Sequence, residues 1–378
     1  MKIAVACDSY KGCMSSSKVN HIIEQAIHDV DDTYEVVTFV MGDGGEGTTA
    51  AFVDACDGEM VTIKVKDAYF RPIEATYGLI DDGKTAVIEV ASCIGLNMYD
   101  REKRKPMHAT SFGVGELLLD ASKRNVKKII LGLGGSSTND GGMGMLQALG
   151  AKFYDEEKNY LKSNAGQLKK IHRIDIKKFK FLKDIEIIAA CDVKNTLLGE
   201  NGATYVFGKQ KGLYPNQIKK LDIAMKDYAD KFKDLGYDIA SHEGSGAAGG
   251  IGGALALLDA HFMSGLELLR SYNHMDNIIE TCDLIITGEG QSDAQTLYGK
   301  VPVGVLDIAN KFKKPCICIS GALGVEYNKL YDLGFIGIYS VADRAMSFEQ
   351  ALKLAPDKLY ACAYTVMKTV HYFVEDYR

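Results

Sequence analysis

The sequence predicts an α/β protein with two α/β domains, one Rossmann-like with a parallel doubly wound sheet and the other a mixed α/β insertion. Both ends of the chain carry short, continuously apolar runs followed by small-residue loops and amphipathic helices, the pattern of a parallel sheet covered by helices. In the middle, three β-like runs follow one another without a helix between them. The 378 residues also exceed the ~250–300 that a single hydrophobic core usually supports.

The N-terminal region alternates strand, loop and helix twice. The run IAVAC at residues 3–7 predicts a buried strand. Apolar residues from Val19 to Val30 recur at i, i+3, i+4, i+7, i+8 and i+11, which predicts an amphipathic helix capped by one of the serines at 15–17. The runs YEVVTFVM, GDGGEGTT and TTAAFVDAC then repeat strand, loop and helix.

The middle of the chain begins with the runs MVTIKVKDAYF, PIEATYGLI and TAVIEVAS, which predict antiparallel hairpins. KKIILGLGG and IEIIAACDV predict further buried strands, and the segment 215–236 predicts a helix. DLIITGEG, PCICISG and FIGIYSVAD bring back the strand, loop and helix pattern. We therefore expect a discontinuous Rossmann-like domain at 1–66 plus 285–378 and an inserted mixed domain at 67–284.

The composition is that of an ordinary globular protein, with 47% hydrophobic and 25% charged residues. A net charge of −6 without a basic stripe argues against nucleic acid and anionic membranes as partners. No apolar run approaches the ~18 residues needed to span a bilayer. Nine scattered cysteines without a C-x-x-C pair indicate reduced thiols and hence a cytoplasmic protein. The oligomeric state stays open, with a homo-oligomer as one alternative.

Two strings match nucleotide-binding motifs. GLIDDGKT at 78–85 satisfies the P-loop string, but a strand follows where that motif needs a helix, so a hairpin turn is the better interpretation. The string G-x-G-x-x-G at 42–47 follows a strand, opens a helix and has Asp67 twenty residues beyond it, as in a dinucleotide-binding fingerprint. Unless a metal ion intervened, Asp43 and Glu46 inside this loop would repel a pyrophosphate, which leaves an NAD-dependent dehydrogenase as the less favoured alternative.

Loops that combine small residues with carboxylates follow five of the expected strands, at 8–12, 42–47, 134–140, 192–195 and 288–293. Because ligands bind outside the carboxyl ends of the strands in open α/β sheets, these loops predict one shared active site. Glycine N–H groups and Ser or Thr hydroxyls can hold phosphate, and carboxylates can hold Mg²⁺. The pattern favours phosphoryl transfer, with Gly134–Thr138 around the phosphate and Asp140 either facing a metal or capping the next helix.

The chain also resembles a known family. The blocks MKIAVACDSYKG, MGDGGEGT, GLGGSSTNDGGMGMLQALGA, AACDVKNTLLGENGA, GSGAAGGIGG and DLIITGEGQSDAQTLYGKVPVGV occur in this order and are similar to those of the bacterial glycerate kinase type-1 family. The resemblance covers nearly the whole chain. It implies an ATP-dependent kinase of glycerate, with 2-phosphoglycerate as the expected product, and two α/β domains with the active site in the cleft between them. A kinase of another small hydroxyacid is the alternative within the same class.

With this resemblance, glycerate and ATP are the expected substrates and Mg²⁺ the expected cofactor. Glycerate is an anion, so Ser9, Lys11 and Arg71 are candidates to bind it, although Arg71 also fits as a brace of the hairpin corner beside Pro72. Asp192 is our candidate for the general base.

The remaining candidates complete the expected site. Asp8 and Lys11 are further catalytic candidates, and Lys300 either neutralises the transferred charge or is a solvated lysine. The metal candidates are Asp43, Asp140, Glu289 and Asp293. The nucleotide or phosphate candidates are Gly134, Gly135, Ser136, Ser137, Thr138, Asn139 and Lys300.

Overall fold

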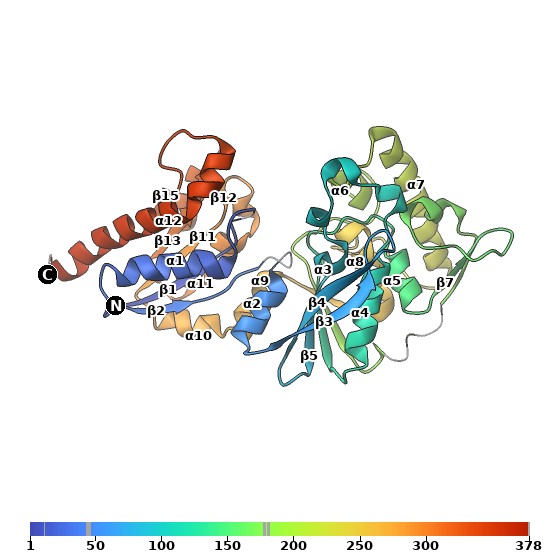
Figure 1. Cartoon of the computed structure of the whole chain (residues 1–378), viewed down its shortest axis with the longest axis horizontal. Coiled ribbons are helices and arrows are strands. Elements are labelled where there is room, and N and C mark those ends of the chain that lie inside the picture. Colours follow the sequence, from blue (N-terminus) through green and yellow to red (C-terminus); the bar gives the residue numbers. More distant parts are fainter. Residues whose placement is uncertain (11, 43–46, 177–178, 180–181, 377–378) are drawn as a thin grey trace. The chain divides into compact units, whose positions relative to one another are not determined.

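The computed structural model describes residues 1–10, 12–42, 47–176, 179 and 182–376. The chain divides into two compact units, which are shown in Figure 1. Unit 1 comprises residues 1–43 and 266–378, and unit 2 comprises residues 44–265. Within the described ranges, no helix combines the length and the apolar character needed to cross a membrane. The predicted candidates Lys11 and Asp43 lie outside the described residues.

Unit 1 contains a five-stranded sheet in which every neighbouring pair of strands is parallel, in the order β15-β13-β11-β1-β2. The strands are β1 (Lys2–Cys7), β2 (Glu35–Thr38), β11 (Leu284–Gly288), β13 (Cys316–Ser320) and β15 (Gly337–Ser340). The chain passes from β1 to β2 on one side and returns at β11 on the other side of β1. The strand order therefore reverses between β1 and β11, which makes this pair the topological switch point of a doubly wound sheet.

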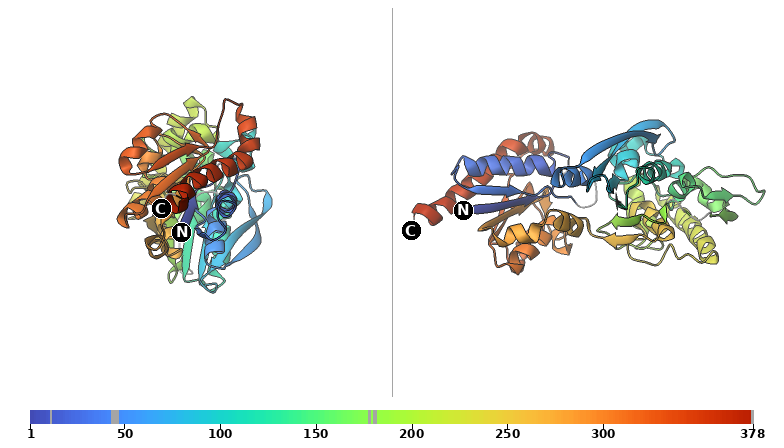
Figure 2. Two further views of the ribbon diagram at one scale, coloured as in Figure 1. Left: turned by 90° about the vertical axis from the view of Figure 1, so that its left-hand side faces the viewer. Right: turned by 90° about the horizontal axis from the view of Figure 1, so that it is seen from below.

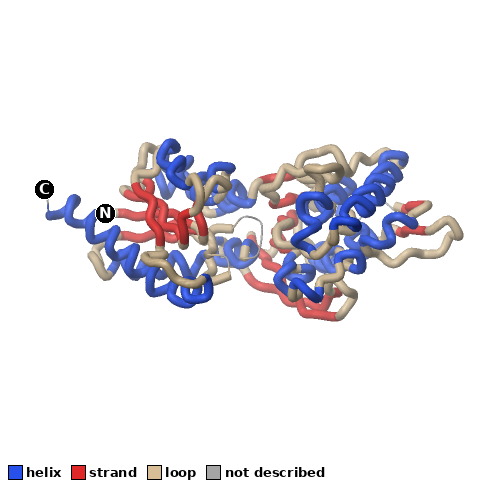
Figure 3. The backbone as a smooth tube through the Cα atoms, turned by 90° about the horizontal axis from the view of Figure 1, so that it is seen from above, coloured by secondary structure: helices blue, strands red, loops and turns tan. Residues whose placement is uncertain are grey.

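Helices cover both faces of the unit 1 sheet, as the right-hand view in Figure 2 and the tube in Figure 3 show. Ile3 and Val5 pack with α1 (Ser16–His28) and α12 (Phe348–His371) on one face. Ala4 and Ala6 pack with α10 (Met275–Glu280) and α11 (Val301–Lys311) on the other face. The alternation along β1 explains why its sequence is continuously apolar. α9 (Gly265–Tyr272) and the short parallel pair β12 (Gln291–Ser292) and β14 (Ala322–Leu323) complete this part of the chain.

Unit 2 contains a mixed six-stranded sheet in the order β10-β9-β6-β5-β4-β3. Its strands are β3 (Glu59–Lys66), β4 (Pro72–Ile80), β5 (Thr85–Glu89), β6 (Lys128–Gly132), β9 (Glu186–Ala190) and β10 (His261–Met263). β3 and β4, and β4 and β5, are antiparallel, as the consecutive β-like runs predicted. The P-loop-like string at 78–85 spans the end of β4 and the turn into β5, which confirms its interpretation as a hairpin turn.

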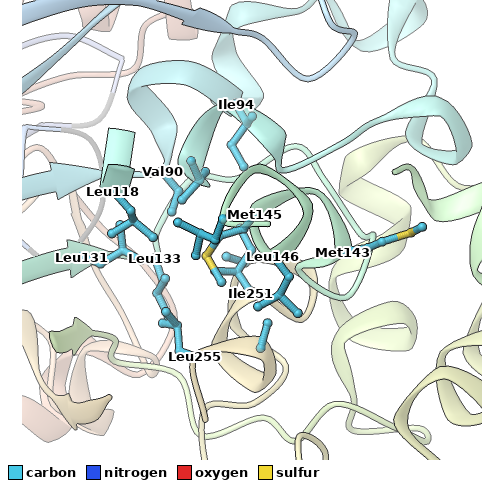
Figure 4. Packing of buried hydrophobic residues seen from close by; sticks show 14 of the residues in the cluster. Val90, Ile94, Leu118, Leu131, Leu133, Met143, Met145, Leu146, Ile251 and Leu255 are labelled. Carbon is cyan, nitrogen blue, oxygen red and sulfur yellow. The ribbon is translucent and has the colours of Figure 1, made fainter. Parts of the chain in front are cut away.

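The helices of unit 2 pack around one large core. They are α2 (Thr48–Ala55), α3 (Ala91–Ile94), α4 (Phe112–Ser122), α5 (Met143–Ala148), α6 (Ala203–Lys211), α7 (Pro215–Asp234) and α8 (Ile251–Ala254), with a separate hairpin of β7 (Lys152–Tyr154) and β8 (Arg173–Asp175). Figure 4 shows the part of the core in which Met145 and Leu146 of α5 lie among Val90, Leu131 and Ile251. The helix α5, which follows the glycine-rich loop, is therefore fixed by its apolar side chains.

The unit boundaries differ from the predicted division at 66/67 and 284/285. Residues 59–66 pair with β4 along the whole of β3, so they belong to the sheet of unit 2. Residues 266–284 include α10, whose Met275 and Ile279 pack in the core of unit 1. The sequence placed β2 and α2 in one repeat, but α2 packs against β4 and β5.

Candidate active site

Unit 2 gathers several predicted site residues at one edge of its sheet. β5, β6, β9 and β10 are parallel, and β3 runs in the same direction because β4 is antiparallel to both of its neighbours. The carboxyl ends of these five strands therefore lie at the same edge. The β3–β4 hairpin with Arg71, the glycine-rich loop after β6 and Asp192 after β9 all lie there, where α/β sheets bind ligands.

The glycine-rich loop opens to solvent only at its beginning. Gly135 is exposed and Gly134 partly so, whereas Ser136–Asn139 are buried. Ser137 anchors the buried part, because its backbone N–H and its hydroxyl both donate to Ile94 O, at 2.8 and 2.9 Å. Among the described residues, no acceptor contacts the backbone N–H of Gly134, Gly135 or Ser136. With Gly135 at a φ of +72°, the open end presents three successive N–H donors, as in backbone nests that bind anions.

Asp140 is a buried cap for two helices. Its Oδ2 accepts hydrogen bonds from Ser111 N, Ser111 Oγ and Gly144 N at 2.8, 3.0 and 3.1 Å, and its Oδ1 accepts from Gly142 N at 3.2 Å. Ser111 precedes α4, and Gly142 and Gly144 lie at the start of α5. Burial raises the pKa of Asp140, and these hydrogen bonds oppose the increase. Of the two predicted roles, the geometry matches the helix cap, because both oxygens already face N–H or O–H donors inside the unit.

A second glycine-rich segment, GSGAAGGIGG, packs directly against the first. Gly141 N donates to Gly249 O at 3.0 Å. A Cβ atom on Gly249, which has a φ of +69°, would lie 2.0 Å from Thr138 O. Only glycine fits this close approach of two backbones, so Gly249 serves the packing of the loop.

Lys211 is a buried residue that the sequence analysis did not single out. It ends α6 and is 3% exposed. Its Nζ donates to Ser136 Oγ at 2.9 Å and to Thr138 O at 2.7 Å, so it lies against the glycine-rich loop. Burial lowers the pKa of Lys211 to about 7, although the negative charge of Asp140 acts in the opposite direction. In the sequence, the burial of Lys211 could have been inferred only from its helical spacing with Thr204 and Gly208. These small residues lie on the same face of α6 as Lys211.

Arg71 braces the β3–β4 hairpin. Its Nε and Nη2 donate to Asp67 Oδ2 at 2.7 and 2.6 Å, and Asp67 Oδ1 accepts from the backbone N–H groups of Tyr69 and Arg71. The guanidinium carbon lies 5.6 Å from the ring centroids of both Tyr69 and Tyr99. The Arg71 side chain nevertheless remains 63% exposed, so an oriented guanidinium stays available at the sheet edge.

Two carboxylates lie at this edge, at the ends of the two strands that flank β6. Asp192 follows β9, is exposed, and accepts a hydrogen bond from Gly265 N at 3.3 Å. Glu89 ends β5, is buried, and accepts from Thr49 N at 2.6 Å and Gly47 N at 3.3 Å. Glu89 therefore caps α2, whose N-cap glycine has no side chain to do so. Glu89 was not among the predicted site residues, because the run TAVIEVAS indicates only a strand.

Unit 1 places two carboxylates side by side at its switch point. Cys7 and Gly288 are register partners at the ends of β1 and β11, and the next residues are Asp8 and Glu289. Asp8 N donates to Gly288 O at 2.8 Å, and Ser9 N donates to Asp8 Oδ1 at 2.7 Å. Both carboxylates are largely buried. They lie at the position where doubly wound sheets bind ligands.

The surroundings of Glu289 combine hydroxyl groups with one lysine. Glu289 Oε1 accepts from Thr296 Oγ1 at 2.5 Å and Ser292 Oγ at 3.1 Å, and Glu289 Oε2 lies 3.3 Å from Lys300 Nζ. Lys300 Nζ also lies 4.0 Å from Asp293 Oδ1. In the part of the chain that the structure describes, no three His, Cys, Asp or Glu side chains gather closely enough to hold a metal ion by themselves.

Comparison with known proteins identifies the family of this chain. The sequence model of the glycerate kinase family matches residues 3–371. The chain belongs to the glycerate kinase family. It is 41% identical over 362 residues to a glycerate kinase from Bacillus cereus, with 95% of each chain covered. It is 39% identical over 373 residues to glycerate 2-kinase from Escherichia coli, with 98% of each chain covered.

A solved structure agrees with this assignment to the glycerate kinase family. The crystal structure of a candidate glycerate kinase 2 from Salmonella typhimurium LT2 matches with a TM-score of 0.85 and 39% sequence identity, covering 98% of each chain. The α/β fold and the resemblance predicted from the sequence are thus confirmed. The chain is a phosphotransferase that phosphorylates glycerate.

The dehydrogenase alternative is wrong for this glycerate kinase family member. A dinucleotide-binding fingerprint needs a strand, a glycine loop and a helix in one βαβ unit. β2 belongs to unit 1, whereas α2 packs on β4 and β5 of unit 2. Asp67, the acid expected at the ribose, is instead held by Arg71 and buried.

The predicted site residues thus fall into two described groups. At the sheet edge of unit 2 lie Arg71, Asp192 and the glycine-rich loop, of which only Gly134, Gly135 and the buried Ser136 border the open end. At the switch point of unit 1 lie Asp8, Ser9, Glu289, Asp293 and Lys300.

Proposed function

We propose that the phosphate donor is ATP, that Mg²⁺ accompanies it, and that the product is 2-phosphoglycerate. The kinase family supports ATP as the co-substrate. The Escherichia coli relative is named as a glycerate 2-kinase, and its 39% identity over nearly the full length supports the 2-hydroxyl as acceptor. The observation that carries the proposal is the open nest at Gly134–Ser136, at the same sheet edge as Arg71 and Asp192.

The nest is the proposed phosphate site of ATP. Phosphoryl transfer needs donors that hold the phosphate oxygens in place while charge develops on them. The backbone N–H groups of Gly134, Gly135 and Ser136 supply such donors without rearrangement, because Ser137 and Asp140 fix the loop behind them. The proposed role of the buried residues Ser137, Thr138 and Asn139 is to hold the conformation of the loop.

Glycerate is proposed to bind through its carboxylate to Arg71, and Ser9 and Lys11 stay predicted substrate-binding residues. Asp67 holds the Arg71 guanidinium in one orientation and leaves its outer N–H groups exposed, a geometry that suits bidentate binding of a carboxylate. Asp192 is proposed as the general base that accepts the proton of the acceptor hydroxyl, because it is exposed at the same edge of the sheet.

The acidic groups of unit 1 fit a Mg²⁺ site. Mg²⁺ usually keeps several waters and uses one or two carboxylates together with substrate phosphates, so a full protein cage is not required. Glu289 and Asp293 offer such oxygen ligands, and Asp8 lies next to Glu289 along the sheet. We propose that Glu289 and Asp293 hold the ion, together with Asp43, and that Lys300 adds positive charge for the transferred group. When bound, Mg²⁺ would neutralise charge on the phosphate oxygens.

The test is product formation from D-glycerate, ATP and Mg²⁺, followed by ³¹P NMR of the product. The expected result is a phosphomonoester signal coupled to one proton, as the phosphate on carbon 2 requires. A signal coupled to two protons would place the phosphate on carbon 3 and contradict the proposed product. If ATP is not consumed with glycerate but is consumed with another hydroxyacid, that hydroxyacid is the substrate and the proposed product is wrong.

The proposed location is the cytoplasm. All nine cysteines are free thiols, as expected for a protein of a reducing compartment.

A further inference from the structure

Lys211 carries a buried amino group with an unusual set of partners. Its two acceptors among the described residues are Ser136 Oγ and Thr138 O, and both are uncharged. An ammonium group has three N–H bonds, so these two acceptors do not use all of them. Lysine is almost never fully buried unless it is paired with an anion. Lys211 nevertheless forms no ion pair within the described residues.

Asp140 does not supply the missing anion. It is the acidic group whose charge acts on Lys211, but its two oxygens accept four hydrogen bonds from Ser111, Gly142 and Gly144. The carboxylate is thus committed to the starts of α4 and α5. The positive charge of Lys211 remains without a contacting counter-ion on the described chain.

The loop that Lys211 contacts is also incompletely satisfied. Thr138 Oγ1 and Asn139 Oδ1 are buried and have no hydrogen-bond partner. The N–H groups of Gly134, Gly135 and Ser136 lack acceptors in the described chain, and Ser136 is both part of this open end and the acceptor of the Lys211 hydrogen bond. The N–H donors of Gly134–Ser136 and the ammonium group of Lys211 therefore come together at Ser136. A single bound anion would accept hydrogen bonds from these donors and neutralise the charge of Lys211.

We propose that Lys211 is a positioning residue of the phosphate site, which orients the Ser136 hydroxyl from behind and supplies the positive charge that a bound nucleotide phosphate neutralises. This inference rests on the proposed role of Gly134–Ser136 as the nucleotide site. It adds a buried cation next to the glycines and hydroxyls that the sequence predicted around the phosphate. A simple structural role would require the hydrogen bonds of Lys211 but not its charge.

The experiment separates charge from hydrogen bonding with two neutral variants. Lys211→Gln keeps a side-chain N–H donor and removes the charge, whereas Lys211→Met removes both. Lys209→Gln is the matched control, because Lys209 lies two residues earlier on α6 and is exposed. For each variant we would measure kcat, KM for ATP, KM for glycerate, and ATP binding by calorimetry.

We expect both Lys211 variants to raise KM and Kd for ATP by about 10-fold to 100-fold, the usual range for loss of a charge-assisted contact. KM for glycerate and all constants of Lys209→Gln should stay within about twofold of the unmodified enzyme. A folded Lys211→Gln enzyme with unchanged affinity for ATP would overturn the inference and leave Lys211 a structural residue.

Ser136→Ala and Gly135→Val distinguish this failure from failure of the proposed nucleotide site. If these loop variants weaken ATP binding and the Lys211 variants do not, only the role of Lys211 is wrong. If none of them affects ATP binding, the nucleotide site itself lies elsewhere.

The unmodified enzyme decides the question if neither neutral variant folds. The groups around the Lys211 amino group are Asp140, the Ser136 hydroxyl and the Thr138 carbonyl, and Arg104 donates to the neighbouring Gln210 O. Above about pH 7.5 the nucleotide phosphates are already ionised. ATP binding that weakens several-fold from there to about pH 9 supports a required Lys211 cation, and a flat profile overturns it.

Discussion

At the scale of single residues, Asp192 offers the clearest test of the chemistry. Asp192→Asn keeps the size of the side chain and removes its basicity. We expect kcat to fall by roughly 10²-fold to 10⁴-fold, the usual contribution of a general base, with little change in either KM. Steady-state kinetics measure this, with Glu243→Gln as a control that neutralises another exposed acid of unit 2. A near-normal kcat for Asp192→Asn would remove this residue from the role.

Lys211 also predicts how stability depends on pH. Its pKa is about 7 in the folded protein and about 10.5 when unfolded, so the unfolded chain binds more protons between these values. Lys211 therefore makes the free energy of unfolding rise with pH from about 7 to about 10, by at most about 1.4 kcal/mol per pH unit. Lys211→Met should remove this slope and be more stable than the unmodified protein near pH 7.

Urea denaturation of both proteins at pH 7, 8 and 9 measures this effect, because other groups contribute equally to both. Equal slopes for the two proteins would mean that folding does not lower the pKa of Lys211, so that its amino group stays protonated in the folded protein over this pH range. A large loss of stability in Lys211→Met at pH 9 would show that its hydrogen bonds to Ser136 and Thr138 outweigh its desolvation.

The predicted site residues lie in or beside loops that follow strands, and the buried Lys211 was not among them. Gly134, Arg71 and Asp192 were identified because small residues and charges after strands are visible as strings. Lys211 was not, because the buried stripe of α6 contains small and polar residues and gives no apolar periodicity. Which face of such a helix is buried depends on residues far away in the sequence, here the loop at 136–138.

At the scale of elements, Asp140 connects the starts of two helices, α4 and α5. Asp140→Asn should destabilise the protein by about 2–4 kcal/mol, because an amide NH₂ group in either orientation would face an N–H donor of Ser111, Gly142 or Gly144. Urea denaturation measures the loss, and Asp155→Asn in an exposed turn serves as the control. The KM for Mg²⁺ should stay unchanged in Asp140→Asn. A large increase in this KM would indicate that Asp140 is a metal ligand after all.

The elements themselves were largely predictable, and their assignment to sheets was not. Continuous apolar runs predicted β1, β6, β9, β11 and β13, and the absence of helices between three β-like runs predicted the hairpins of β3–β5. The partner sheet of α2 could not be read from the sequence, because TTAAFVDAC has the same apolar pattern on either sheet. A serine or aspartate in a glycine-rich loop is equally ambiguous, because its sequence pattern fits both a helix cap and a residue that binds phosphate or metal.

At the scale of the whole molecule, the continuity of unit 2 has a testable consequence. Residues 44–265 form one uninterrupted segment that contains its complete six-stranded sheet and a single large core. Because the strands β3–β10 find all their partners within the segment, we expect residues 44–265 to fold alone, with cooperative unfolding in urea followed by circular dichroism. Unit 1 is built from two distant segments, so its sheet needs both ends of the chain.

The isolated segment also separates nucleotide binding from catalysis. It keeps Gly134–Ser136 and Lys211 but lacks Glu289, Asp293 and Lys300. We therefore expect it to bind ATP measurably by calorimetry and to transfer no phosphoryl group to glycerate, since the proposed Mg²⁺ ligands of unit 1 are missing. The same segment with Lys211→Met is the control, and it should bind ATP about 10-fold or more weakly. A folded segment without any affinity for ATP would mean that the open nest is insufficient to hold the nucleotide, and that residues of unit 1 supply most of the binding energy.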